Sequence, residues 1–214
     1  MKCVAVVLSG CGFMDGSEIH ESVLTLLALS KRNAIVQCIA PNINQHRVWN
    51  HKENQDENSS RNVLEEAARI ARGEIKDIQD INAEDFDAVI FPGGYGAALN
   101  LCDFAIKGKE MSVNSQIIEF SRAMKNKPQG FMCIAPVMIA KIFDAPVKVT
   151  VGHDKDVIEA ISQMGCEHIS VGANEIVVDE KYKVVTTPAY MSGCSIAEIA
   201  VGIDKLVQKV LSLA

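Results

Sequence analysis

Short apolar runs alternate with stretches of helical periodicity along most of the chain. Apolar runs of strand length occupy residues 3–8, 34–40, 86–91 and 130–133. Helical periodicity marks residues 18–30, 62–72, 115–125, 137–143, 157–164 and 196–211. Near the end of the chain, EIVVDEKYKVVTT has two β-branched runs around a polar turn, which predicts a β-hairpin. The alternation predicts an α/β fold, with a mostly parallel sheet and helices on both faces.

The length of 214 residues suits one compact domain, so residues 1–214 are predicted to fold as a single unit. The polar segment HKENQDENSS, residues 51–60, is predicted to be a solvated loop, with a functional lid as the alternative. No apolar run reaches the roughly 20 residues of a membrane span, so no membrane partner is expected. The amino terminus, MKCVAVVLSG, has the pattern of a strand rather than a targeting segment, which favours a cytoplasmic location.

Charge and cysteine content narrow the classes of partner. The net charge of −6 includes no basic cluster with interleaved aromatic residues, so a nucleic acid is not expected as a partner. The seven cysteines are odd in number and widely spaced, which favours reduced thiols, and no CxxC pair predicts a zinc site. The glycine spacing at residues 10–16 is looser than a dinucleotide fingerprint. No metal and no cofactor are therefore predicted.

Cys133 lies where a short strand ends and a helix with Pro136 in its first turn begins. This placement puts the thiol at the carboxyl edge of the sheet, where open α/β folds bind ligands. A helix amino terminus favours thiolate over thiol and would activate a nucleophile. A nucleophile elbow, however, has glycine two positions before and after the nucleophile, where this chain has Phe131 and Ala135. The pattern leaves open whether Cys133 is a nucleophile or part of the core.

Two neighbouring glycines and a loop histidine are further candidates. Gly93 and Gly94 follow a strand, and the amide of Gly94 could form an oxyanion hole together with the amide of Ile134. A plain glycine turn is the alternative interpretation. His153 follows a β-branched run and is predicted near the sheet edge, although a loop histidine is more often solvated than catalytic.

Two acids occupy the first turn of the helix predicted at residues 18–30. That helix is apolar almost all round, so it is predicted to be largely buried together with Glu18 and Glu21. Burial would raise the pKa of a carboxyl group there, whereas the helix dipole would lower it. The alternative is that both acids only complement the start of the helix.

Six segments carry a resemblance to a known family. They are SGCGFMDGSEIHE, RNVLEEAARIARGEI, FPGGYGAALNL, GFMCIAPVM, VTVGHD and VVTTPAYM. In this order they resemble the ElbB-like proteins, also called sigma cross-reacting protein 27A-like, of the PfpI and class I glutamine-amidotransferase-like superfamily. The resemblance covers nearly all of the chain. It implies a flavodoxin-like three-layer sandwich with Cys133 on a nucleophile elbow, Glu21 hydrogen-bonded to its sulfur, and Gly94 and Ile134 as oxyanion donors.

The resemblance also implies an activity. ElbB-like proteins are associated with a cofactor-independent glyoxalase activity on small dicarbonyls and with isoprenoid production, and homodimers are common in the superfamily. In this chain Cys133 would add to glyoxal or methylglyoxal to give a hemithioacetal. Glu21 would move the proton between the two carbonyl carbons, and Glu18 or His153 would assist. The products would be glycolate or lactate.

The sequence departs from the superfamily pattern at two places. Many relatives carry histidine directly after the nucleophile, where this chain has Ile134, and the glutaminase His/Glu pair is not recognisable after Pro188. These departures keep two alternatives open. One is a non-catalytic redox-sensing or binding module that retains the elbow cysteine, and the other is a glutaminase-like amidotransferase.

Overall fold

Seven strands form the central sheet of the computed structural model, which describes residues 1–214. Their order is β10-β11-β7-β6-β1-β2-β5, and every neighbouring pair is parallel except β10 and β11. The strands are β1 Cys3–Val7, β2 Ile35–Ala40, β5 Ile75–Asp77, β6 Ala88–Phe91, β7 Gln129–Met132, β10 Val177–Asp179 and β11 Val184–Thr187. The predicted α/β class and the hairpin at the end of the chain are confirmed.

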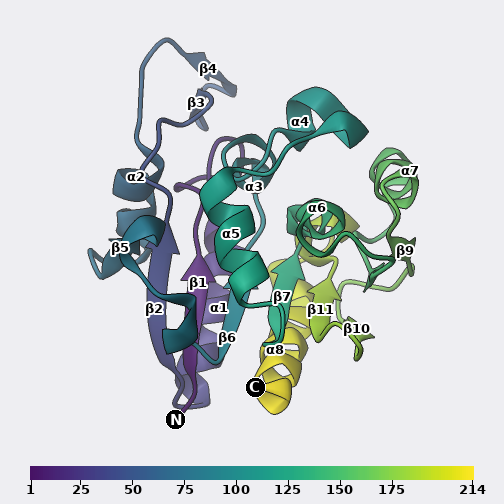
Figure 1. Cartoon of the computed structure of the whole chain (residues 1–214). Coiled ribbons are helices and arrows are strands. Elements are labelled where there is room, and N and C mark those ends of the chain that lie inside the picture. Colours follow the sequence, from purple (N-terminus) through teal and green to yellow (C-terminus); the bar gives the residue numbers. More distant parts are fainter.

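Helices cover both faces of the sheet and complete a three-layer sandwich (Figure 1). One apolar core lies under α3, α5 and α6, and a second lies under α1, α2 and α8. The helices are α1 Ile19–Lys31, α2 Val63–Ile70, α3 Tyr95–Leu99, α4 Phe104–Lys107, α5 Ser115–Ala123, α6 Ile139–Phe143, α7 Lys155–Gln163 and α8 Ile196–Leu213. The carboxyl ends of the parallel strands point upward in Figure 1, toward α3 and α4.

Two small sheets lie outside the central one. β3, Val48–Asn50, pairs with β4, Gln55–Glu57, and β8, Lys148–Val149, pairs with β9, Glu167–His168. The β3–β4 hairpin stands at the top of Figure 1. It corrects the prediction of a loop at residues 51–60, because that segment contains β4, although nearly all of its side chains are exposed as expected.

Helix α1 is less buried than its composition predicts. Glu21 and Leu29 are fully buried, but Ile19, Val23 and Leu27 are 43–49% exposed. The sequence gives α1 apolar residues on every side, and only one side finds a partner within the chain. The homodimer implied by the resemblance stays a prediction.

Contacts at both ends of α1 fix its position. Arg32, at the end of the helix, donates two hydrogen bonds to Asp204 of α8, with lengths of 2.7 and 2.8 Å. Such bidentate, charge-assisted pairs fix orientation as well as distance. At the other end, the Glu18 backbone N–H donates to the carbonyl oxygen of Gly93, directly after β6. The first turn of α1 is thereby held at the carboxyl edge of the sheet.

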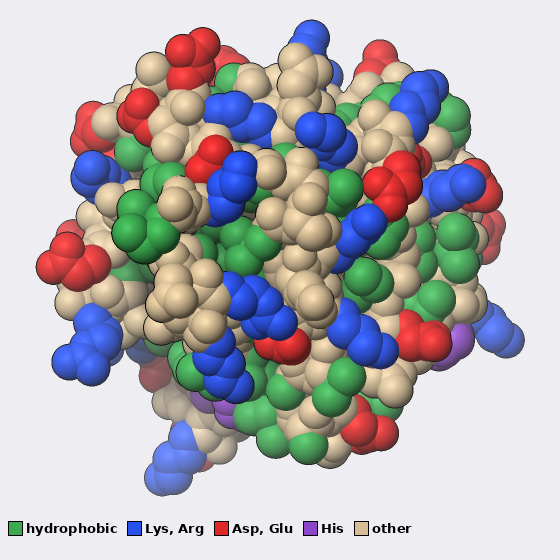
Figure 2. Space-filling view, turned by 90° about the horizontal axis from the view of Figure 1, so that it is seen from below, with side chains coloured by type: hydrophobic (Ala, Val, Ile, Leu, Met, Phe, Trp, Pro, Cys, Tyr) green, Lys and Arg blue, Asp and Glu red, His purple; other side chains and the backbone are tan.

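The face opposite this edge carries a mixed surface. Figure 2 looks at the molecule from below and shows lysine, arginine and acidic side chains scattered among apolar ones. None of the helices is both long enough and apolar enough to cross a membrane.

Candidate active site

Cys133 sits on a sharp turn between β7 and a short 3-10 turn, Ala135–Met138. Its φ of +60° lies in the left-handed region, which costs a residue with a side chain about 1 kcal/mol or more. The Cys133 N–H donates to the carbonyl oxygen of Thr187 at 3.1 Å, which ties the turn to the end of β11. Pro136 occupies the start of the 3-10 turn, as predicted. The backbone geometry is that of a nucleophile elbow.

Gly93 provides the space that this elbow needs. A Cβ atom at Gly93 would lie 2.3 Å from the Cβ of Cys133 and 2.7 Å from Oε2 of Glu21. Phe131 and Ala135 can occupy the positions usually held by glycine, because the backbone that comes close to Cys133 belongs to the segment after another strand. Gly93 follows β6, which pairs directly with β7. The sequence therefore contains the required glycine, but on the neighbouring strand–helix loop.

Glu21 lies against the sulfur and has no solvent exposure. Its Oε2 accepts a hydrogen bond from Gly93 N–H at 2.8 Å, its Oε1 accepts one from Tyr190 N–H at 3.2 Å, and the carboxyl is also hydrogen-bonded to Cys133. Burial, followed by the negative charge of Glu18, raises the pKa of Glu21 to about 7. A carboxyl group with this pKa exchanges protons at neutral pH.

The sulfur of Cys133 receives two backbone donors, the N–H groups of Gly94 and Ile134. Burial and then the charge of Glu21 nevertheless raise the pKa of the Cys133 thiol well above its usual value. This direction is opposite to the sequence-based expectation of a thiolate favoured by a helix terminus. The 3-10 turn after Cys133 has only four residues, and desolvation of the sulfur outweighs its donors. Near pH 7, Glu21 is the group that changes protonation.

A cavity of about 550 Å³ opens onto Cys133, a residue that is 7% exposed. Ten of its fourteen lining residues are hydrophobic, and the polar side chains Glu18, His20 and Asp154 also face it. Gly94 and Ile134 line it beside the sulfur. The thiol therefore points into a cavity rather than into closed core packing.

Glu18 is the N-cap of α1, and its Oε2 accepts a hydrogen bond from Glu21 N–H at 2.7 Å. Replacing Glu18 by glutamine keeps an oxygen for this cap but removes the negative charge that raises the pKa of Glu21. We expect Glu18→Gln to move the titration midpoint of the Glu21 carboxyl to a lower pH. The measurement is a carbon-13 NMR titration of the glutamate side-chain carboxyl groups from pH 5 to 9, with the Glu21 signal assigned as the one missing in Glu21→Gln. Glu119→Gln, at an exposed position of α5, is the charge-matched control, and identical midpoints in all three proteins would contradict the role of Glu18.

His153 is not brought to the sulfur. Its side chain is exposed and does not line the cavity. The β-branched run before it contains β8, which pairs with β9 in a small sheet rather than in the central one. The turn after β8 therefore leads His153 toward His168, whose pKa it lowers after the effect of burial. The predicted assisting role of His153 has no geometric support.

The sequence interpretation missed His20 and Tyr190. His20 Nδ1 lies 2.7 Å from the Tyr190 hydroxyl, and both side chains line the cavity. The Tyr190 backbone N–H also holds Glu21. His20 directly precedes Glu21 in the chain, so its place in the same helical turn as the two acids was an available signal. No group of three or more His, Cys, Asp or Glu side chains is arranged to hold a metal ion.

Comparison with solved structures shows which class of protein has this fold. No protein-family model matches the chain. The chain is 35% identical to an isoprenoid biosynthesis protein with an amidotransferase-like domain from Ehrlichia chaffeensis, with a TM-score of 0.92 and coverage of 99% of this chain and 100% of that one. DJ-1 of Schizosaccharomyces pombe shares the fold, with a TM-score of 0.60 at 15% identity over 100% and 96% of the two chains. The fold and the elbow define a class I glutamine amidotransferase-like protein.

Curated relatives identify the family within that class. The chain is 46% identical to Glutamine amidotransferase-like class 1 domain-containing protein 3, mitochondrial, of Homo sapiens, over 98% of this chain and 82% of that protein. It is 44% identical to the ES1 protein homolog, mitochondrial, of Rattus norvegicus, over 98% and 83%. It is 35% identical to the ES1 protein, mitochondrial, of Danio rerio, over 88% and 76%. The chain belongs to this ES1 family, and the predicted ElbB-like resemblance is confirmed.

The prediction of a cytoplasmic location is wrong. All three of these relatives are named as mitochondrial proteins. The prediction rested on the strand pattern at the amino terminus, which the structure contains as β1. A strand at that place describes the fold and carries no information about the compartment.

Proposed function

We propose that the protein is a cofactor-independent, glyoxalase-type enzyme that converts 2-oxoaldehydes to 2-hydroxy acids. The observation that carries the proposal is the group of contacts around Cys133. A carboxyl group with a pKa of about 7 and two backbone N–H donors meet its sulfur beside a cavity. The DJ-1/PfpI superfamily, which includes glyoxalase III enzymes, supports the same class of chemistry.

The first step is addition of the thiol to the aldehyde. The Glu21 carboxylate accepts the proton of Cys133 while the sulfur bonds to the aldehyde carbon, and the electron pair of the C=O bond moves to its oxygen. This oxygen is two bonds away from the sulfur, to which the N–H groups of Gly94 and Ile134 donate in the free protein. They would stabilise its negative charge. Transfer of the proton from Glu21 to the oxygen gives the hemithioacetal and restores the carboxylate.

The second step is an internal proton transfer. The Glu21 carboxylate removes the proton from the sulfur-bearing carbon, which leaves an enediolate across the two former carbonyl carbons, and the hydroxyl proton passes to the former ketone oxygen. The carboxyl then returns the proton to the neighbouring carbon, which leaves a 2-hydroxyacyl thioester on Cys133. Water attacks the thioester, and the sulfur leaves with a proton. Methylglyoxal and one water give lactic acid, so the reaction requires no external oxidant or reductant.

The central test is turnover of methylglyoxal followed by proton NMR. We expect wild-type protein to form lactate and Cys133→Ser to be slower by about 10³-fold or more, because serine is a poorer nucleophile and loss of a nucleophile removes the covalent route. Cys3→Ser is the matched control, since Cys3 is a half-buried free thiol in β1. Equal rates for wild type and Cys133→Ser would remove Cys133 from the mechanism.

The site geometry favours this proposal over the two alternatives. Peroxide sensing needs an accessible thiolate, and burial raises the pKa of Cys133. Glutaminase chemistry commonly pairs the cysteine with a histidine, and here the side chain against the sulfur is a carboxyl. A link to isoprenoid production, the process in the name of the Ehrlichia chaffeensis protein, and a homodimer complete the proposal. Light scattering after size-exclusion chromatography tests the homodimer.

A further inference from the structure

We infer that the cavity beside Cys133 selects 2-oxoaldehydes that carry an extended apolar chain, rather than glyoxal or methylglyoxal. The inference rests on the proposed function and specifies its substrate class. It depends on three features of the cavity, which are its volume, the distribution of polar and apolar groups in its walls, and the contacts that hold its rim.

The cavity is too large for the smallest dicarbonyls. Its volume is about 550 Å³. Methylglyoxal has five heavy atoms, so at roughly 30 Å³ for each water-sized unit of liquid it fills no more than about 150 Å³. Cavities between about 300 and 1,000 Å³ usually enclose ligands of many more atoms. Most of the space beside the sulfur would stay filled with water when methylglyoxal is bound.

Polar groups are concentrated on the side of the cavity that carries α1. Glu18 and His20 line the cavity from the same helical turn as Glu21, which touches the sulfur. The lining residues from α4 and α7, which lie at the upper right of Figure 1, include Phe104 and Val157. These two walls therefore suit a dicarbonyl head at Cys133 and an apolar tail directed away from α1.

Asp154, the acid on the α7 side of the cavity, already accepts a hydrogen bond within the protein. Asp154 is the N-cap of α7, and its Oδ1 accepts a hydrogen bond from Val157 N–H at 3.1 Å. An N-cap carboxylate is satisfied by this donor and by the helix dipole. Asp154 therefore already has a partner within the protein and does not require a polar group on the ligand.

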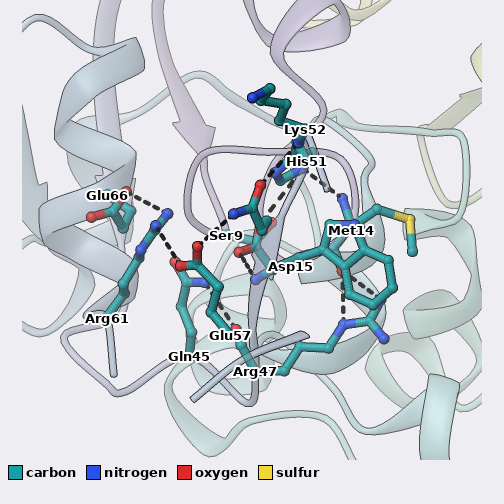
Figure 3. Close-up of polar contacts among 12 residues, drawn as sticks. Ser9, Met14, Asp15, Gln45, Arg47, His51, Lys52, Glu57, Arg61 and Glu66 are labelled. Carbon is teal, nitrogen blue, oxygen red and sulfur yellow. Dashed lines mark hydrogen bonds and ion pairs between the residues drawn. The ribbon is translucent and has the colours of Figure 1, made fainter. Parts of the chain in front are cut away.

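The aromatic rim of the cavity is held by the segment that contains β3. Arg47 donates from Nε and Nη2 to the carbonyl oxygen of Met14, at 3.0 and 2.7 Å, and His51 accepts from Met14 N–H at 3.4 Å (Figure 3). The Phe13 ring packs edge-on against His51, and the Arg47 guanidinium lies over the Tyr95 ring. Phe13 and Tyr95 both line the cavity. The rim is thus supported before any ligand binds, which lowers the entropic cost of binding.

The test is a series of alkylglyoxals of increasing chain length, from methylglyoxal through 2-oxopentanal to 2-oxoheptanal. We expect kcat/KM to rise about threefold for each added methylene group, because each group moves from water into contact with an apolar wall. Turnover of methylglyoxal with a flat or falling series would overturn the chain-length inference and leave the glyoxalase proposal intact. Absence of turnover for every member would refute the proposed function and the inference with it.

A pair of variants on α4 tests the apolar wall directly. Phe104 is half-buried and lines the cavity, whereas Ile106, on the same short helix, is 53% exposed and does not line it. We expect Phe104→Ala to lower kcat/KM for 2-oxoheptanal about tenfold more than for methylglyoxal. Ile106→Ala is expected to change the ratio of the two values by less than about twofold. An equal loss for both aldehydes in Phe104→Ala would overturn the assignment of this wall to the chain.

Discussion

Replacing Glu21 by glutamine is expected to lower kcat/KM for a 2-oxoaldehyde about 10³-fold, within the usual range for loss of a general base. Glutamine cannot accept a proton from Cys133 or from the substrate carbon. In the wild-type protein the carboxylate fraction of Glu21 rises through its pKa of about 7, so activity should rise over the same interval. The measurement is a kcat/KM profile from pH 5 to 9. The variant should lose the step near pH 7 as well as the rate.

Glu21 should also affect stability in a pH-dependent way. Its pKa is about 7 in the folded protein and near the ordinary 4.5 when unfolded, so between these values the folded state binds more protons. The free energy of unfolding should therefore fall as pH rises from about 4.5 through 7, by on the order of 3 kcal/mol. Glu21→Gln removes this dependence. Its amide can accept only one of the N–H donors of Gly93 and Tyr190, which costs about 1–3 kcal/mol.

Urea unfolding at pH 5 and pH 8 separates these two effects. At pH 5 the wild-type carboxyl is protonated, and Glu21→Gln should be clearly less stable than wild type. At pH 8 the wild type carries a buried negative charge, so the difference should narrow. Glu119→Gln on α5 controls for loss of an exposed charge. A constant difference at both pH values, with an unchanged activity profile, would contradict the raised pKa of Glu21.

The main strands and helices could be predicted from the sequence because each has its own pattern of apolar and polar residues. Each of the four predicted apolar runs forms a strand of the central sheet, and the six predicted helices are present with small shifts at their ends. The short elements β5, α3 and α4 were not predicted. Helix α3 has the sequence YGAAL, whose glycine disfavours a helix, and it is held by tertiary contacts such as Gly96 N–H to Gly16 oxygen at 2.9 Å.

The site shows the same division between local and non-local causes. The position of Cys133 and the acids at the start of α1 could be predicted from a strand–helix junction and a helical turn. The raised pKa of the Cys133 thiol could not be predicted, because it depends on how completely Glu21 and neighbouring chain segments exclude water from the sulfur. The cavity could not be predicted either, since Phe13, Phe104 and Tyr190 reach it from segments far apart in the sequence.

Replacing Gly93 by alanine adds only one methyl group at the site and is expected to be strongly damaging. The φ of Gly93 is outside the left-handed region, so alanine is compatible with the backbone there. The new Cβ would instead meet the Cβ of Cys133 at 2.3 Å and the Glu21 carboxylate at 2.7 Å. We expect the free energy of unfolding to fall by about 3 kcal/mol, as for overpacking of a dense core. The measurement is urea unfolding together with methylglyoxal turnover.

Gly172→Ala is the matched control, because its φ is also ordinary and the nearest atom to the added Cβ is a side-chain oxygen of Asn174 at 3.3 Å. This control should change stability by less than about 0.5 kcal/mol. Gly93→Ala should in addition lose turnover even where it remains folded, since relief of the clash must move Cys133 or Glu21. Full activity together with full stability would mean that the Cys133 sulfur and the Glu21 carboxyl do not have to remain in contact. That result would contradict both the general-base role of Glu21 and the elbow geometry on which this role depends.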